Sequence, residues 1–148
     1  MKRRTLLSGF ALLPLLQGLP AFAATRIHVY KNPDCGCCAD WVKHLESAGF
    51  AVQVTEVSDT AETRKKLGMP EKFGSCHTAT VDGYLLEGHV PAADVKRLLA
   101  RRPKALGLAV PGMPAGSPGM EVGSRKDPYQ VLLVSRSGNA SVFASYNP

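Results

Sequence analysis

Three of the chain's four cysteines lie within four residues, at Cys35, Cys37 and Cys38, and they follow a segment with the pattern of a β-strand. Residues 26–30 (RIHVY) alternate and are rich in β-forming side chains, which predicts that strand. Residues 36–48 carry apolar side chains at helical spacing and precede a glycine, a favoured residue just past a helix end. The pattern therefore places the cysteines at the N-terminal turn of a helix that directly follows a strand.

The next segments predict a further alternation of strands and helices. A second strand is predicted at 50–57, a short helix at 60–67, two short strands within 78–87 and a helix at 91–99. Asp82-Gly83, between the two short strands, is a strong hairpin turn signal. The order β-α-β-α-β-β-α and the C-x-x-C spacing of Cys35 and Cys38 at a helix start match the thioredoxin-like fold. We therefore predict an α/β chain with a thioredoxin-like core.

The composition changes beyond Pro103. Prolines and glycines alternate from there to about residue 128, which predicts a long irregular loop of the kind that is often functional in compact domains. Residues 129–135 and 140–146 are strand-like on either side of a Ser-Gly-Asn turn. They predict a β-hairpin appended to the sheet.

The N-terminal residues 1–23 have the three parts of a cleaved signal peptide. Basic residues at 2–4 precede an apolar stretch at 6–19, and Ala-Phe-Ala at 21–23 is a small-x-small cleavage site. The apolar stretch is too short and too interrupted for a membrane span of about 20 apolar residues, so no span is expected after cleavage. The paired arginines leave both the Sec and the twin-arginine export routes open. The mature chain, residues 24–148, is predicted to be a single thioredoxin-like domain.

The positive charge of the chain does not indicate a nucleic-acid partner. Three of the 18 lysines and arginines lie in the leader, which leaves 15 against 12 acidic residues. The remaining basic residues are scattered, with short runs at 64–66 and 101–102 near predicted helix ends, where cations are favourable. No basic stripe interleaved with aromatic residues accompanies them, so nucleic acid is not expected to bind.

The fourth cysteine, Cys76, directly precedes the predicted third strand. In thioredoxin-like folds the loop entering that strand approaches the C-x-x-C pair and usually carries a cis-proline, whereas this chain has Cys76-His77 there. All four thiols are therefore predicted to converge. Structural disulfides are the ordinary expectation for an exported chain, but a bridge within residues 35–38 would close only a tiny loop and constrain little of the unfolded chain.

Four converging thiols indicate a soft metal ion. A dithiol oxidoreductase needs one attacking and one resolving sulfur, so two thiols would be in excess. Soft thiolates select copper(I), zinc or iron–sulfur clusters. Zinc usually takes ligand pairs from two separated knuckles, and the adjacent Cys37 and Cys38 cannot easily both face one tetrahedral ion. Adjacent sulfurs suit copper(I) better, including a multinuclear cluster in which each thiolate bridges more than one ion.

Three further side chains are candidate ligands. Met113 and Met120 lie in the proline- and glycine-rich loop, and thioethers favour copper(I), although packing against the core is an equal alternative. His77 is a candidate because it adjoins Cys76 and imidazole suits copper. His89, near the start of the last predicted helix, is expected to be a local turn residue instead.

Four segments of the chain carry a family resemblance. They are residues 32–38 (NPDCGCC), 75–79 (SCHTA), 87–91 (EGHVP) and 107–121 (GLAVPGMPAGSPGME). On these motifs the chain resembles the CopG-like family of bacterial periplasmic copper-resistance proteins, long classed as a domain of unknown function. The resemblance implies a thioredoxin-like fold, a periplasmic location and copper binding through Cys35, Cys37, Cys38 and Cys76. It also implies a role in copper tolerance, with copper redox conversion as the proposed chemistry.

Two functions remain open from the sequence. The first is a periplasmic protein that holds copper(I) on four cysteines in copper resistance, with copper/thiol redox conversion as a further activity and other periplasmic copper-handling proteins as partners. The alternative is a thiol–disulfide oxidoreductase that acts on exported proteins through Cys35 and Cys38. The additional thiol of Cys37, and Cys76 in place of the usual proline, favour the first function.

Overall fold

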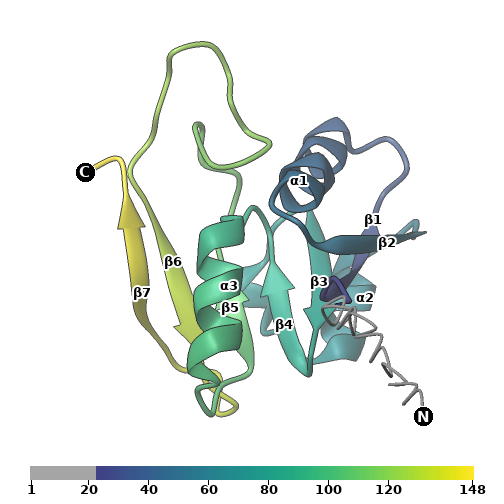
Figure 1. Ribbon diagram of the computed structural model, residues 1–148, viewed down its shortest axis with the longest axis vertical. Helices are drawn as coiled ribbons and strands as arrows, with labels where there is room; N and C mark the ends of the chain where they lie inside the picture. The colour runs from purple at the N-terminus through teal and green to yellow at the C-terminus, as the bar shows by residue number, and fades with distance from the viewer. Residues whose placement is uncertain (1–22) are drawn as a thin grey trace, which may run out of the picture.

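A mixed sheet of seven strands, in the order β2-β1-β3-β4-β5-β6-β7, forms the centre of the computed structural model, which describes residues 23–148 (Figure 1). The helices are α1 (Gly36–Ser47), α2 (Thr60–Leu67), the short 3-10 helix η1 (Glu71–Phe73) and α3 (Ala92–Arg101). The strands are β1 (Arg26–Lys31), β2 (Ala51–Glu56), β3 (His77–Val81), β4 (Tyr84–Glu87), β5 (Gly107–Ala109), β6 (Tyr129–Val134) and β7 (Ala140–Tyr146). The predicted signal peptide lies outside the described residues, apart from its last position.

The predicted α/β class is confirmed, and most predicted elements are present within two residues of their expected ends. Strand β1 pairs in parallel with β2 and antiparallel with β3, and β3 and β4 form the expected hairpin. Its turn residues Asp82 and Gly83 both have positive φ, 45° and 84°, as a type I′ turn requires. The finer assignment to a thioredoxin-like topology stays a prediction.

One strand lies within the stretch that was predicted to be irregular. Strand β5 pairs in parallel with β4 and antiparallel with β6, so it joins the predicted β6–β7 hairpin to the rest of the sheet. The prediction was wrong there because β5 has only three residues and begins with a glycine. Gly107 is needed because a Cβ atom at this position would overlap the Leu85 carbonyl oxygen of β4.

The two faces of the sheet bury different clusters. One cluster contains Trp41 and Leu45 of α1 and Val95 and Leu98 of α3, and the other contains Phe73 of η1. Neighbouring residues of β4 belong to different clusters, as expected from side chains that alternate between sheet faces. Helices α1 and α3 therefore cover one face, and the segment that contains η1 covers the other.

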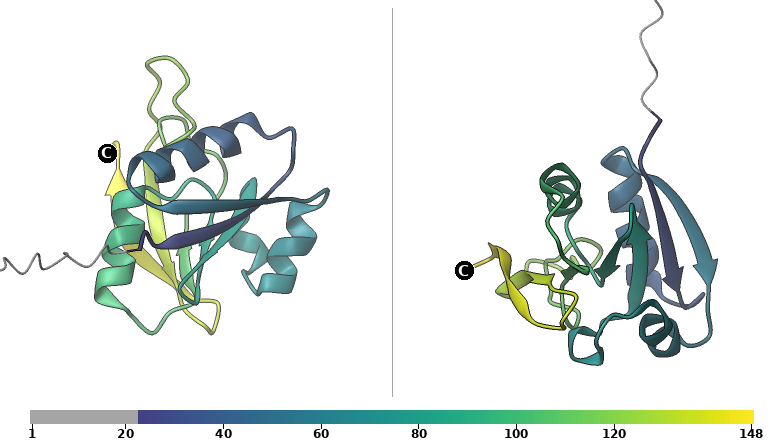
Figure 2. Two further views of the ribbon diagram at one scale, coloured as in Figure 1. Left: turned by 45° about the vertical axis from the view of Figure 1, so that its right-hand side comes forward. Right: turned by 90° about the horizontal axis from the view of Figure 1, so that it is seen from below.

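The loop between β5 and β6 lies beside α1, as Figure 2 shows. It therefore reaches the end of the sheet at which α1 begins and β3 starts. Within residues 23–148, no helix combines the length and apolar composition that are needed to cross a bilayer.

Candidate metal centre

Two elements bring four sulfur atoms together. Cys35 precedes α1, Cys37 and Cys38 lie in its first turn, and Cys76 directly precedes β3. All four Sγ atoms lie within 4.8 Å of one another. The Sγ atom of Cys37 lies between the two segments, 3.5 Å from that of Cys35 and 3.9 Å from that of Cys76. The structure thus has the predicted convergence of the four cysteines, while their role as metal ligands stays a prediction.

The four sulfurs are in two oxidation states. Cys35 and Cys38 form a disulfide, and Cys37 and Cys76 are free thiols. A disulfide sulfur is a poor metal ligand, because it is the thiolate that binds metal. The full set of four thiolates therefore forms only after a two-electron reduction of the Cys35–Cys38 bond.

Two buried histidines extend the sulfur cluster. The Sγ atom of Cys76 lies 3.3 Å from Nδ1 of His77 and 3.1 Å from Nε2 of His89. These three residues form a second group whose ligand atoms lie within metal-binding reach of one another. Among the described residues, the buried Nε2 atom of His77 has no hydrogen-bond partner. The arrangement offers soft sulfur and imidazole nitrogen side by side, a donor set that suits copper.

The prediction that His89 is only a local turn residue was wrong. Its ring is fully buried and faces Cys76. The predicted hairpin contained the signal that was missed, since Thr78 pairs with Glu87 and each step outward from the turn adds one residue to both strands. Two steps beyond that pair, residue 76 on one side meets residue 89 on the other.

A hydrogen bond fixes which nitrogen of His89 faces the thiol. Nδ1 lies 2.8 Å from the carbonyl oxygen of Pro118, which can only accept, so Nδ1 carries the proton and Nε2 presents its lone pair to Cys76. Burial lowers the pKa of His89, and burial together with the neighbouring His89 lowers the pKa of His77 to about 3. Both rings are therefore neutral and can act as ligands at neutral pH.

The thiol of Cys76 is held in its protonated form in the absence of a cation. Burial raises the pKa of this thiol to about 12, and the neighbouring Cys37 is the second cause of the increase. Binding of a soft cation would displace this proton, because the thiolate is the ligand.

The loop after β5 packs directly on the first turn of α1. Gly119 has a φ of 85°, and a Cβ atom at this position would lie 2.7 Å from the carbonyl oxygen of Cys37 and 2.8 Å from the backbone nitrogen of Trp41. The side chain of Trp41 is buried, donates to the carbonyl oxygen of Val90 at 2.8 Å and packs against the ring of His77. The loop and Trp41 thus enclose the cluster from two sides.

The two loop methionines differ in exposure. Met113 is 54% exposed, whereas Met120 is half-buried and follows Gly119, which contacts α1. Both degrees of exposure are compatible with a contact between the methionine thioether and the cysteine sulfurs. The role of Met113 and Met120 as ligands stays a prediction.

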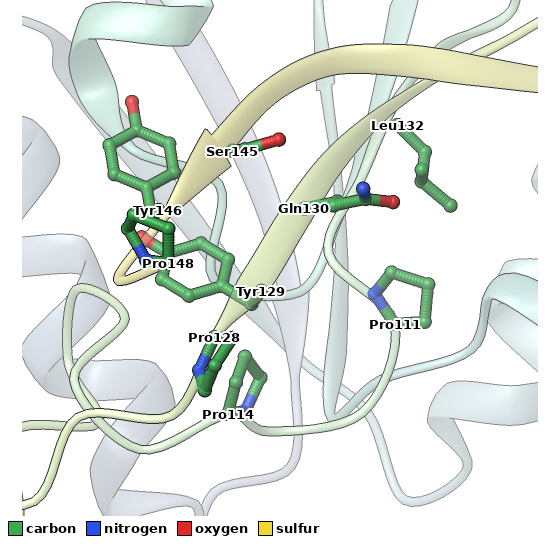
Figure 3. Close-up of a pocket in the computed structure, with 9 residues that line it drawn as sticks. All are labelled: Pro111, Pro114, Pro128, Tyr129, Gln130, Leu132, Ser145, Tyr146 and Pro148. Atoms are coloured by element: carbon green, nitrogen blue, oxygen red, sulfur yellow. The ribbon is translucent and has the colours of Figure 1, made fainter.

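A surface pocket elsewhere in the fold shares no residue with the cysteine cluster. It has a volume of about 650 Å³ and is lined by Pro111, Pro114, Pro128, Tyr129, Gln130, Leu132, Ser145, Tyr146 and Pro148 (Figure 3). It contains no thiol or imidazole group. A metal ion bound directly by converging side chains needs no such cavity, so the cysteine cluster stays the candidate site.

Known proteins similar to this chain include a family without an assigned function and two copper-resistance proteins. Residues 73–120, which include Cys76, His77, His89, Met113 and Met120, match a family model described as "Protein of unknown function, DUF411". Two solved structures, "Copper resistance protein copG- Form 2" and "Copper resistance protein copG- Form 1", are each 50% identical to the chain with a TM-score of 0.80. They cover 84% and 85% of this chain and 100% of their own length. A comparison with curated proteins gave no match. At this identity and coverage, the chain belongs to the CopG-like family of copper-resistance proteins.

Proposed function

We propose that the protein binds copper(I) through Cys35, Cys37, Cys38 and Cys76 and acts in copper resistance. The observation that carries the proposal is the position of the four sulfur atoms within 4.8 Å of one another at the start of α1. Thiolates at a helix N-terminus are stabilised by the unpaired N–H groups of the first turn. Copper resistance is the function named for the two solved relatives.

The donor set favours copper(I) over zinc. Cys37 and Cys38 are adjacent, so they suit bridging positions in a multinuclear copper cluster better than two corners of one tetrahedron. His77 and His89 add nitrogen donors on the Cys76 side, at 3.3 and 3.1 Å from its sulfur. Met113 and Met120 supply thioethers from the loop in this proposal.

Reversible oxidation of the cysteines would connect copper binding to copper redox conversion. Two copper(II) ions accept one electron each from the Cys35 and Cys38 thiols, the two sulfurs form a disulfide, and two protons leave. The products are two copper(I) ions. The Cys35–Cys38 disulfide supports this reaction because it is the oxidised form that the reaction requires.

The same disulfide supports the alternative function. An oxidised C-x-x-C pair at a helix start is also what a thiol–disulfide oxidoreductase presents to exported proteins. In that function Cys37 and Cys76 would have no necessary role. Substitution of either residue therefore distinguishes the oxidoreductase from the copper-binding protein.

The cellular location belongs to the same proposal. A signal peptide at residues 1–23 would direct the chain to the periplasm and leave residues 24–148 as one folded domain. Copper ions and other periplasmic copper-handling proteins would be its partners there.

Anaerobic titration of the reduced mature protein tests the proposal. We expect copper(I) to bind with a defined stoichiometry and to remain bound when excess zinc is present, as measured by metal analysis after desalting. Preferential retention of zinc, or no retained metal, would contradict the assignment.

The methionine prediction concerns retention of copper. If Met113 and Met120 are donors, replacing both with leucine should preserve folding, since leucine and methionine exchange at a cost below about 1.5 kcal/mol. The double variant should lose copper(I) faster to a competing chelator. Met69→Leu, at a core position that is 2% exposed, is the matched control. Equal retention in the parent and the double variant would leave the loop methionines as packing residues.

A further inference from the structure

A buried ion pair lies beside the segment that carries Cys76. Arg64 of α2 is 3% exposed and Glu87, the last residue of β4, is fully buried. The Nε atom of Arg64 donates to Oε1 of Glu87 at 2.7 Å. Neither side chain belongs to the sulfur cluster.

The ion pair holds both backbone polar groups of Ser75, the residue before Cys76. The Ser75 N–H group donates to Oε1 of Glu87 at 2.7 Å, and Nη2 of Arg64 donates to the Ser75 carbonyl oxygen at 2.6 Å. On the other side of Cys76, the hydroxyl of Thr78 donates to Oε2 of Glu87 at 2.6 Å. One carboxylate therefore holds the chain both before and after the thiol.

Cys76 needs such support more than Cys37 and Cys38 do. Cys37 and Cys38 are fixed by the backbone of α1, whereas Cys76 lies in the connection between η1 and β3. The guanidinium of Arg64 fills the space beside Gly74 in this connection, where a Cβ atom would lie 2.9 Å from Nη1.

Stability alone does not account for a buried pair of this kind. Removing two charges from water is costly, and well-packed apolar residues in their place are often equally stabilising or more so. What the charges provide here is a set of directional, charge-assisted hydrogen bonds to a particular stretch of backbone.

We propose that Arg64 and Glu87 are positioning residues that hold the Cys76 sulfur within bonding range of Cys37. Where copper is concerned, this role rests on the proposed function. The role also applies to the metal-free protein, because two thiols whose sulfurs lie 3.9 Å apart can join as a disulfide.

The metal-free test measures how readily these two sulfurs join. In mature protein carrying Cys35→Ser and Cys38→Ser, only Cys37 and Cys76 retain thiols. At equilibrium with glutathione, their disulfide forms as one oxidised glutathione accepts two electrons and two protons and leaves as two thiols. Adding Arg64→Lys should lower the equilibrium constant for forming this disulfide about tenfold, which corresponds to about 30 mV for two electrons. The reason is that the single ammonium group of lysine cannot reproduce the hydrogen bonds that the forked guanidinium donates to Glu87 and Ser75.

The control removes another buried charge that touches none of the cluster. Asp94 is 2% exposed, pairs with Arg97 and accepts a hydrogen bond from Tyr146 at 2.7 Å. Asp94→Asn, added to the Cys35→Ser and Cys38→Ser protein, should change the equilibrium constant by less than about twofold, whatever its effect on stability. If Arg64→Lys does not fold in a urea titration, Thr78→Val is used instead, with about a threefold decrease expected from loss of one hydrogen bond to Glu87.

The copper test is a double-mutant cycle in protein with all four cysteines. Arg64→Lys should lower copper(I) affinity about tenfold, and in the Cys76→Ser background it should change affinity by less than about twofold. An equal loss in both backgrounds, or an unchanged glutathione equilibrium, would overturn the positioning role. If Cys76→Ser itself leaves copper affinity unchanged while the glutathione equilibrium shifts as expected, the copper proposal fails and the positioning role stands.

Discussion

Replacing Cys76 with serine is expected to lower the affinity for copper(I) by about 100-fold or more. Metal sites lose up to about 100-fold when only an outer-shell partner is removed, so loss of a direct ligand should cost at least as much. Serine offers a hard hydroxyl oxygen in place of a soft sulfur, and copper(I) prefers sulfur. The measurement is an anaerobic competition with a copper(I) chelator on the reduced protein.

The same variant separates the two proposed functions. An oxidoreductase that uses Cys35 and Cys38 keeps its activity in Cys76→Ser, because attack and resolution need only those two sulfurs. His28→Ala is the control for general effects of substitution, since His28 bonds Thr55 and Tyr30 and no residue of the cluster. Parent-like copper affinity in Cys76→Ser, with vigorous reduction of insulin disulfides by the parent, would favour the oxidoreductase.

Keeping the Cys35–Cys38 disulfide intact is expected to reduce the copper(I) bound to about half or less of the amount in the reduced protein. Two of the four sulfurs are then unavailable as thiolates, and only Cys37 and Cys76 remain free. Metal analysis and a thiol count on matched oxidised and reduced samples give the measurement. A thiol reductant should restore full binding.

The control for this prediction cannot form the disulfide. Protein with Cys35→Ser and Cys38→Ser, kept reduced so that Cys37 and Cys76 stay as thiols, should bind the same low amount of copper as the parent with its disulfide intact. Equal binding by the oxidised and reduced parent protein would exclude Cys35 and Cys38 from the copper site.

The sequence predicted those parts of the fold and site that depend on local pattern. Asp82-Gly83 identified the β3–β4 hairpin because few other residue pairs adopt two positive φ angles. The convergence of Cys76 with Cys37 followed from the predicted order of strands and helices, which brings the entrance of β3 beside the start of α1.

The parts that the sequence did not predict depend on contacts between distant segments. Strand β5 exists because β4 and β6 flank it, since its three residues have little strand pattern of their own. The roles of Arg64 and Glu87 arise from hydrogen bonds across 11 to 23 positions of the chain, which no local pattern encodes. His89 was predictable in principle, because extending the hairpin register places it opposite Cys76.

X-ray absorption at the copper K-edge identifies the oxidation state of the metal and the atoms that bind it. On reduced protein loaded anaerobically with copper(I), we expect an edge typical of copper(I) and a first shell made mainly of sulfur. In Cys76→Ser the sulfur contribution should decrease. A first shell of nitrogen and oxygen alone in the parent protein would contradict copper binding by the four cysteines.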